Sequence, residues 1–463
     1  MFTTTSAQHQ NRSVEEEVLF EFYNETGGSN WTNQCAEGKV GSCWLAPQTN
    51  HCYWLGVQCN TQGLVTTLSL PNNNLSGDPP PVLGKLTSLE TLNLGYNNFN
   101  QFSPIPKEWT TLPNLISLDI SNCSITTTPQ MKHLTNLRNL SVQGFLDDMS
   151  FLSSLKNLEI FDMSYNVIFP ELPTQLTPVH SLRYLIARYC AICDIPSLAN
   201  HTCMVHLDLN HQIPTDCGDR VFSLEILSSM PNLEYLDLDM HPNTNFSDPD
   251  VLSYIFHLSR IRTLNLHNVH LDIPFPPTFF SSLPHLEVLD MSGTSIESEI
   301  PRNIGIAANL TRLILRDNFI SGSIPDSILN LHRLTVLDFH NNSISGPIPT
   351  QLGHNVSSLQ ILDLGLNQIS GPLPDSIGQM RNLTYLSLKS NLLIGSIPAR
   401  AWRDLLNLRV FDLSRNNLTG YIYPDIQKAF EGLQKLDLSF NGFIGDMPGL
   451  DRGYSMQYLV CCE

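Results

Sequence analysis

The chain has 463 residues, 41% of them hydrophobic, and its 43 acidic and 25 basic side chains give a formal net charge of −18. This acidity argues against nucleic acid and against an anionic membrane as partners, and it favours a basic partner or one that is not selected by charge. An acidic surface that only keeps the protein soluble is the simpler explanation. No run of about 18 apolar residues is present, so we expect no transmembrane helix within the chain.

The N-terminal stretch predicts a short disordered segment followed by a helix. Residues 1–12 lack the basic start and apolar core of a signal peptide and are expected to be disordered or the remnant of a leader. Ser13 and Glu16 fit a capping box, and Val14, Val18 and Phe22 belong to an apolar stripe at helical spacing. We expect this helix to cover the open end of the repeats that follow.

Cysteines and glycosylation sequons indicate an oxidising compartment. The chain has eleven cysteines, four of them within residues 35–59. A zinc site of these four is disfavoured, because their spacing does not form two C-x-x-C knuckles. Of the thirteen N-x-Ser/Thr sequons, we expect glycosylation at Asn24, Asn200, Asn245, Asn309, Asn355, Asn382 and Asn417.

From residue 65 to residue 457 the chain repeats one phrase about sixteen times. Its clearest copy is residues 310–325, LTRLILRDNFISGSIP, in which Leu313 and Leu315 predict a short strand with buried leucines. The amide of Asn318 is expected to turn inward and satisfy backbone groups of its own and neighbouring coils. One coil cannot bury its leucines alone, so the period of 24 or 25 residues predicts a solenoid.

The phrase L-x-x-L-x-L-x-x-N-x-L with its x-G-x-I-P tail resembles the plant-type leucine-rich repeat. The stretch CYWLGVQC at residues 52–59 resembles the N-terminal cap of the same proteins, although Tyr53 stands in place of a second adjacent cysteine. The resemblance implies an α/β repeat solenoid, a right-handed superhelix or horseshoe with short parallel strands on its concave face. It also implies a helical cap over residues 13–64 with disulfides Cys52–Cys59 and Cys35–Cys43. Residues 458–463 would begin a truncated C-terminal cap.

The repeats are irregular at residues 137–285, where coils lengthen and the turn asparagine is lost. Cysteine replaces it at Cys123 and Cys190, an exchange that the general pattern allows. The residues at this position that do not fit are Phe145, Gln212, His241 and Val269. Although Cys190 and Cys193 have redox spacing, we expect Cys123 and Cys190 to be buried thiols. Cys193 is expected to form a disulfide with Cys203 or with Cys217.

Two sets of outward side chains are candidates for binding. Aspartate recurs between the strand leucines and predicts an acidic file along the concave face, formed by Asp119, Asp162, Asp208, Asp237, Asp290, Asp338, Asp363, Asp412 and Asp437. The simpler explanation is that Leu-Asp-Leu is frequent in this repeat class, with the carboxylate solvated. The irregular coils add residue types that dominate interfaces, namely Arg183, Tyr184, Arg188, Tyr189, His206, His211, Tyr235, Asp237, Asp239, Arg262 and His267. A metal site of His206, His211 and His241 lacks ligand spacing, so no metal or cofactor is expected.

No hydrolase, metalloprotease, P-loop or kinase motif is present, and we expect no catalysis. The resemblance implies an extracellular recognition module. It would be like the ectodomain of a receptor-like protein or receptor kinase, or like a polygalacturonase-inhibiting protein. Such a module would be secreted or at the cell surface, after loss of a leader that this chain does not contain, and would bind a protein, peptide or glycan, with a basic partner favoured. A structural cell-wall, matrix or ice-surface protein is the alternative.

Overall fold

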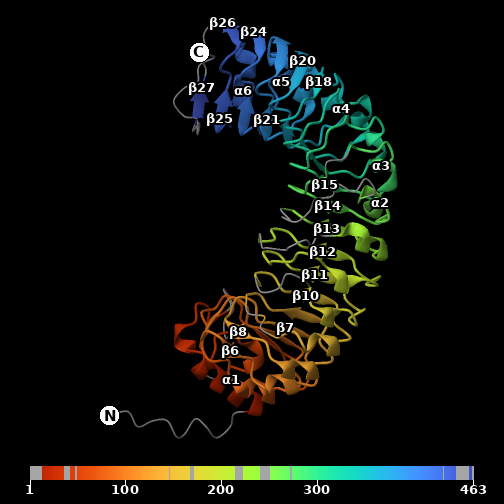
Figure 1. Cartoon of the computed structure of the whole chain (residues 1–463). Helices are drawn as coiled ribbons and strands as arrows, with labels where there is room; N and C mark the ends of the chain where they lie inside the picture. The colour runs from red at the N-terminus through yellow and green to blue at the C-terminus, as the bar shows by residue number, and fades with distance from the viewer. Residues whose placement is uncertain are drawn as a thin grey trace. The chain divides into compact units, whose positions relative to one another are not determined.

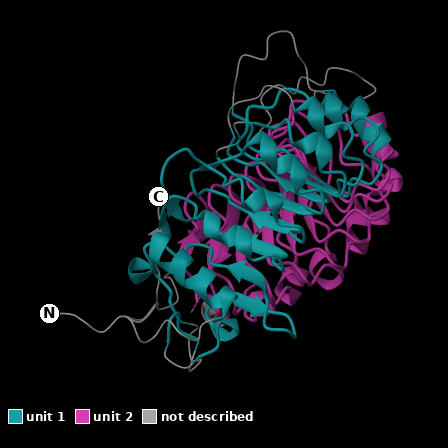
Figure 2. Ribbon diagram, turned by 90° about the horizontal axis from the view of Figure 1, so that it is seen from below, with its two compact units in different colours: residues 1–230 teal, residues 231–463 magenta. Residues whose placement is uncertain are grey.

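The computed structural model describes residues 13–35, 42–46, 49–144, 146, 148–166, 172–213, 223–239, 251–271, 274–430, 432–444 and 458–460. Two compact units divide the chain after Met230 (Figure 2). The division falls inside the stretch that the sequence predicts to be irregular. No helix in the described part is long and apolar enough to cross a membrane.

Unit 1 begins with the predicted helix, α1 (Val14–Glu25), which is capped by Ser13 accepting a hydrogen bond from the backbone N–H of Glu16 at 3.2 Å. Val18 and Phe22 are buried as expected, but Val14 is 70% exposed because it occupies the first turn, away from the repeats. The side chain of Glu15 accepts a hydrogen bond from the backbone N–H of Val65 at 3.0 Å. The helix therefore closes the end of the first repeat strand.

Both predicted cap disulfides form, Cys35–Cys43 and Cys52–Cys59, which excludes a zinc site of these four cysteines. Beneath them lies an aromatic cluster, in which the ring of Trp44 lies 4.8 Å from that of Trp31 and 5.1 Å from that of Trp54. Such ring pairs stabilise a cap beyond the area that they bury.

The strands of unit 1 form one sheet along its coils. β1 (Val57–Cys59) pairs antiparallel with β2, and every later pair is parallel. The parallel strands are β2 (Val65–Ser69), β4 (Thr91–Asn93), β7 (Ser117–Asp119), β9 (Asn139–Ser141), β10 (Ile160–Asp162), β11 (Tyr184–Ile186) and β12 (His206–Asp208). Two small side pairs are β3 (Ser76–Gly77) with β5 (Asn98–Phe99) and β6 (Ser103–Pro104) with β8 (Ile125–Thr126). The 3-10 turns are η1 (Gly28–Asn30), η2 (His51–Tyr53), η3 (Pro81–Lys85), η4 (Trp109–Thr111), η5 (Pro129–His133), η6 (Leu152–Ser154), η7 (Thr174–Leu176), η8 (Pro196–Leu198) and η9 (Leu224–Ser229).

Unit 2 stacks its strands in the same way, and α2 and α3 lie on the side of the coils opposite to β13, β14 and β15 (Figure 1). Its main parallel strands are β13 (Tyr235–Asp237), β14 (Thr263–Asn265), β15 (Val288–Asp290), β16 (Arg312–Ile314), β17 (Val336–Asp338), β19 (Ile361–Asp363), β21 (Tyr385–Ser387), β23 (Val410–Asp412), β25 (Lys435–Asp437) and β27 (Tyr458–Val460). The helices and 3-10 turns are α2 (Val251–Phe256), α3 (Phe279–Ser282), α4 (Leu352–Asn355), α5 (Ala399–Trp402), α6 (Gln427–Phe430), η10 (Ile304–Ile306), η11 (Asp326–Asn330), η12 (Asp375–Gln379) and η13 (Pro424–Ile426).

The x-G-x-I-P tails of unit 2 add a second parallel sheet, which the sequence analysis did not predict. It consists of β18 (Ser345–Gly346), β20 (Gln368–Pro372), β22 (Leu392–Gly395), β24 (Asn417–Tyr421) and β26 (Gly442–Ile444). At the C-terminal end, β27 pairs with β25 as the strand of a further coil. Residues 461–463 of the expected C-terminal cap lie outside the described residues.

The register of the main strands confirms the repeat solenoid with its buried leucine core. Leu313 lies opposite Leu337, which lies opposite Leu362, and none of the three has measurable exposure. Burial of each such side chain contributes roughly 1.5–3 kcal/mol relative to exposure. Alternation along the strand then fixes which residues face outward.

The inward-turned asparagine makes the network that was predicted. The Nδ2 of Asn318 donates to the carbonyl oxygens of Met291, Leu315 and Arg316 at 2.8, 3.0 and 3.1 Å. Its Oδ1 accepts from the backbone N–H of Ile296 at 3.0 Å. One side chain thus closes its own turn and ties it to the preceding coil.

The off-pattern positions divide into different cases. The prediction that Gln212 does not fit is wrong, because its Nε2 donates to the carbonyl of Ala187 at 2.7 Å and its Oε1 accepts from the N–H of Ile192 at 3.0 Å. The glutamine side chain, which is one methylene longer, therefore makes hydrogen bonds equivalent to those of asparagine at this position. Val269 is fully buried and apolar, so this network is absent from its side chain. Phe145 and His241 lie outside the described residues.

The predicted thiols are partly confirmed. Cys123 and Cys190 are buried free thiols, and burial raises their pKa to about 12 and about 11. Cys193 takes part in a disulfide, as expected. Cys203 is an exposed free thiol, so the pairing Cys193–Cys203 is wrong. The alternative partner, Cys217, lies outside the described residues.

Replacing Asn318 by alanine should lower the free energy of unfolding of unit 2 by about 2–4 kcal/mol, because the buried backbone groups that it pairs lose their partner. Urea unfolding followed by circular dichroism would measure this loss. Asn330→Ala, at an exposed position, is the control, and Asn318→Gln should retain part of the stability, as Gln212 does in unit 1. Equal unfolding midpoints for the two alanine variants would contradict the assigned role.

Among the described cysteines, Cys203 should be the one that reacts with iodoacetamide in the native protein, because burial and raised pKa values keep Cys123 and Cys190 protonated and inaccessible. Peptide mass mapping before and after denaturation would test this. Native labelling of Cys123 or Cys190 would contradict the described burial.

Candidate functional site

The outward side chains of the main parallel strands, β2 to β27 of the larger sheet, form what we call the strand face. In the coil of Leu313 and Leu315 they are Arg312, Ile314 and Arg316, which lie before, between and after the two leucines. We call the positions equivalent to Ile314 the central column. Because the strands are paired in register, equivalent side chains of adjacent coils stand about 4.8 Å apart.

Every predicted aspartate occupies the central column, and each one has a structural role. Its Oδ1 accepts a hydrogen bond from the backbone N–H two residues further on, at 2.9–3.3 Å, which closes the turn after the strand. This turn explains why the Leu-Asp-Leu pattern is frequent in the chain. The second oxygen is left for contacts on the strand face.

The predicted aspartates do not form a continuous acidic file. In register, Asp338 is adjacent to Asp363 and Asp412 to Asp437, but Ser141, Ile186, Asn265, Ile314 and Ser387 interrupt the column elsewhere. Cations from neighbouring positions also neutralise two of the carboxylates, because Arg188 pairs with Asp208 and Lys435 lies 2.8 Å from Asp412. The ring of His340 lies 3.2 Å from Asp363. The remaining negative charge is therefore confined to short stretches of the column and does not run along the whole strand face.

Asp338 is the carboxylate most affected by its surroundings. Burial raises its pKa from the ordinary 3.8 to about 6, and the adjacent charge of Asp363 adds to the rise. The backbone N–H of His340, which donates to Asp338 at 3.0 Å, acts in the opposite direction. This group therefore changes charge in mildly acidic solution.

The predicted binding residues of unit 1 form two contacting rows. The guanidinium of Arg183 lies 6.0 Å from the ring of Tyr184, which lies 5.7 Å from the ring of His206. Arg188 forms an ion pair with the buried carboxylate of Asp208 at 2.5 Å. Burial lowers the pKa of His206, so this ring is neutral near pH 7.

The second row of unit 1 is an aromatic stack along the edge of the strand face. The rings of Tyr165 and Tyr189 are stacked at 4.9 Å and 8°, and the ring of His211 follows Tyr189 at 4.9 Å. Each of these residues stands directly before the turn position, with positive φ values of 51–63°. Their side chains thus project from the same point of successive coils.

The predicted binding residues of unit 2 make their own contacts. The hydroxyl of Tyr235 donates to Asp237 at 3.0 Å, and His267 pairs with Asp239 at 2.8 Å, a hydrogen bond that raises the pKa of His267. Arg262 lies between two glutamates of adjacent coils and pairs with both. The predicted patch is therefore divided between the two units.

Sequence reasoning named Asp119 and Asp162 but missed the group around them in unit 1, which we call the tyrosine–aspartate cluster: Tyr96, Asp119, Gln143, Asp162 and Tyr165. The hydroxyl of Tyr96 donates to Gln143 Oε1 at 3.0 Å, and Gln143 Nε2 donates to Asp162 Oδ2 at 2.7 Å. Burial raises the pKa of Tyr96, and Asp162, Asp119 and Tyr165 add to the rise. Tyrosine directly before the turn position, at residues 96, 165 and 189, was the available signal.

Within the tyrosine–aspartate cluster, Asp119 and Asp162 are separated by one strand, that of Ser141. Neither carboxylate has a cationic partner among the described residues. Gly95 leaves room for Asp119, since a Cβ there would approach the carboxylate oxygen to 2.9 Å. Tyr96 and Tyr165 are half exposed beside these charges, at 51% and 53%.

The expected glycosylation sites lie away from the strand face where they are described. Asn24 lies in α1, Asn355 in α4 and Asn417 in β24, while Asn200 and Asn382 are exposed in turns. The side chain of Asn309 donates to the carbonyl of Pro284 at 3.3 Å and so already has a role between coils. Asn245 lies outside the described residues.

Leucine-rich-repeat family models match residues 65–107, 114–142, 285–305, 309–331, 333–355, 358–380 and 381–443. Receptor-like protein 6 of Arabidopsis thaliana is 30% identical over 239 residues, which are 46% of this chain and 22% of that protein. The chain spans no more than about a fifth of the first curated relatives that it matches.

Solved structures of plant receptors share the fold. The ectodomain of the Arabidopsis receptor kinase HAESA, in complex with a peptide hormone ligand, matches with a TM-score of 0.70 and 25% identity over 93% of this chain and 73% of that one. A TDR receptor matches with a TM-score of 0.68 and 26% identity over 82% of this chain and 69% of that one. The resemblance to plant leucine-rich-repeat proteins is thereby confirmed.

Asp338→Asn should flatten the pH dependence of stability. Because the folded-state pKa of Asp338 lies above that of the unfolded chain, its contribution is present at low pH and is lost as pH rises from about 4 through about 6. The loss is on the order of 2–3 kcal/mol. Thermal unfolding between pH 4 and pH 7 would show a smaller fall in Tm for the variant, whereas Asp317→Asn, at an exposed site, should resemble the parent.

Proposed function

We propose that this leucine-rich-repeat protein is the non-catalytic recognition part of an extracellular, receptor-like protein. It binds a peptide on the strand face, and a positively charged side chain of the peptide enters the tyrosine–aspartate cluster of unit 1. The observation that carries the proposal is the presence of two carboxylates, Asp119 and Asp162, without a cationic partner among the described residues and beside two half-exposed tyrosine rings.

The geometry of the cluster suits a guanidinium or ammonium group. Two strand spacings separate the backbones of Asp119 and Asp162, about 9.6 Å, and both side chains extend from the same face. A planar guanidinium has donors on opposite edges and can bridge two carboxylates. The rings of Tyr96 and Tyr165 offer π faces to the same cation.

The neighbouring coils are chemically distinct. Arg188 already neutralises Asp208, so that carboxylate is not open to a ligand cation. The stack of Tyr165 and Tyr189 extends from the cluster and offers further aromatic contact area to the next residue of a bound chain. Support for a peptide rather than a glycan comes from HAESA, whose structure contains a peptide hormone.

Asp162→Asn and Tyr165→Ala should each weaken binding of Arg- or Lys-containing peptides about tenfold, since each removes a charge-assisted or cation–π contact. Fluorescence anisotropy with synthetic peptides, and with the same peptides carrying glutamine at the basic positions, measures the effect. Asp437→Asn and Tyr421→Ala are matched controls in unit 2. Raising the salt concentration should reduce the difference.

Three variants separate this site from the rest of the strand face: Tyr184→Ala, Arg188→Ala and Tyr235→Ala. Retained affinity in all three, together with loss in Asp162→Asn, supports the cluster. If the three variants lose affinity for the basic peptide and Asp162→Asn does not, the ligand binds on the irregular coils instead. Equal affinity for basic and glutamine-substituted peptides would remove the charge argument.

A further inference from the structure

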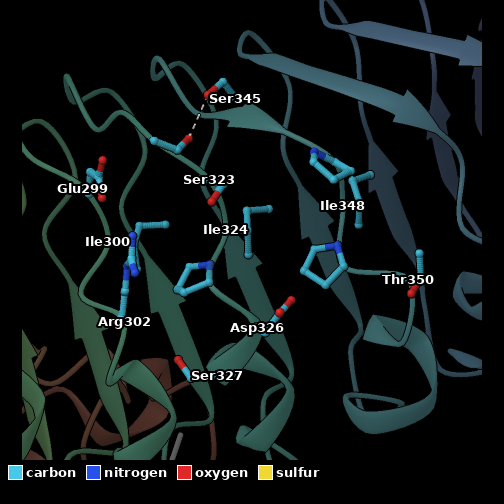
Figure 3. A pocket seen from close by; sticks show the side chains of 14 residues that line it. Glu299, Ile300, Arg302, Ser323, Ile324, Asp326, Ser327, Ser345, Ile348 and Thr350 are labelled. Carbon is cyan, nitrogen blue, oxygen red and sulfur yellow. Dashed lines mark hydrogen bonds between the residues drawn. The ribbon is translucent and has the colours of Figure 1, made fainter.

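A cavity of about 800 Å³ lies in unit 2 where three successive coils leave the strand face through their Ile-Pro dipeptides (Figure 3). We call it the I-P pocket and define it by Glu299, Arg302, Ile324, Asp326, Ser327 and Ile348. None of its lining residues belongs to the strand face. Its volume is within the range of small-molecule sites, about 300–1,000 Å³.

The I-P pocket has an apolar floor. Ile300, Ile324 and Ile348 lie at equivalent positions of the three coils and are 1–4% exposed. The rings of Pro325 and Pro349 lie beside them. These side chains are packed mostly between the coils, and only a small part of their C–H surface faces the pocket.

The rim of the I-P pocket is polar, and its charges are unpaired. Glu299, Arg302 and Asp326 form no salt bridge or side-chain hydrogen bond within the described part of the chain. The hydroxyl of Ser327 is enclosed and also lacks a hydrogen-bond partner there. Because its oxygen is enclosed, this hydroxyl lies behind the pocket wall, and the polar groups open to a ligand are the three charged side chains.

The backbone fixes the position of Glu299. Gly322 has a φ of +74°, and a Cβ at this glycine would come within 2.8 Å of the Cγ of Glu299. The absent side chain therefore lets the glutamate lie flat against the next coil at the pocket. The carboxylate of Glu299 on one coil and that of Asp326 on the next therefore both lie at the rim of the I-P pocket.

We propose that the I-P pocket binds a short neutral oligosaccharide. Sugar rings combine apolar C–H faces with hydroxyls that both donate and accept, which matches a floor of isoleucine and proline beneath two carboxylates and a guanidinium. Two carboxylates against one arginine disfavour an acidic sugar. A metal ion is not expected, because the structure brings no third metal-ligating side chain to Glu299 and Asp326 among the described residues.

Saturation-transfer NMR and calorimetry on the full chain, with cellotriose as the neutral probe and trigalacturonate as the acidic one, test the proposal. Cellotriose should bind more tightly. Glu299→Gln and Asp326→Asn should each weaken it about tenfold through loss of a charge-assisted hydrogen bond. Ser323→Trp, which fills the pocket from an exposed position, should abolish binding.

Matched controls are Glu297→Gln, which is outside the pocket, and Asp375→Asn, which follows Pro374 as Asp326 follows Pro325. Both should bind cellotriose like the parent, as should Asp162→Asn, so failure here is independent of the peptide proposal. Three results would each overturn the inference: no saturation transfer from the protein to cellotriose, the same saturation transfer in Ser323→Trp as in the parent, or tighter binding of trigalacturonate than of cellotriose.

Discussion

The architecture of both units depends on the amide that turns inward after most of the strands. Asn318 pairs with a carbonyl of the preceding coil as well as with carbonyls of its own. Asn342 and Asn367 repeat the arrangement in the next two coils. Because the same contact sets the phase between neighbours wherever an amide holds this position, the leucines fall into a continuous core and the outward residues fall into columns. Burial of the leucines supplies the favourable free energy of folding, and the amide determines how neighbouring coils are aligned when the leucines are buried.

In a column of stacked coils, the role of an outward side chain depends on its neighbours in the adjacent coils. An outward side chain of one coil has two fixed neighbours, so local chemistry is decided by short runs of equivalent positions. Asp208 and Asp412 meet a cation and become structural ion pairs, whereas Asp119 and Asp162 meet tyrosine and glutamine. The same residue in the same repeat position is therefore neutralised in one place and available in another. This difference, more than the net charge of −18, is what a ligand would distinguish.

The predictions that succeeded rest on local patterns. The strands, the asparagine network, the capped helix and the two cap disulfides follow from spacing and family resemblance. What the sequence could not predict depends on side-chain length and reach. Gln212 replaces asparagine because one added methylene still reaches Ala187, and Tyr96 contacts Gln143 across an intervening coil. The pairing of Cys193 was open because the sequence could not distinguish between Cys203 and Cys217. The site residues of the irregular coils remain a prediction, now divided into one set for each unit.

The aspartates of the central column share their two oxygens between folding and recognition. In Asp162, Oδ1 holds the turn of Ser164 while Oδ2 faces Gln143 and the open strand face. A cation that bound Oδ2 would polarise the carboxylate and draw on the same group that closes the turn. Binding of the cation and rigidity of the turn would then be thermodynamically linked, so that the turn opens less often in the bound protein than in the free one. A receptor built in this way could transmit the presence of its ligand through the stiffness of successive coils, without a change in their shape.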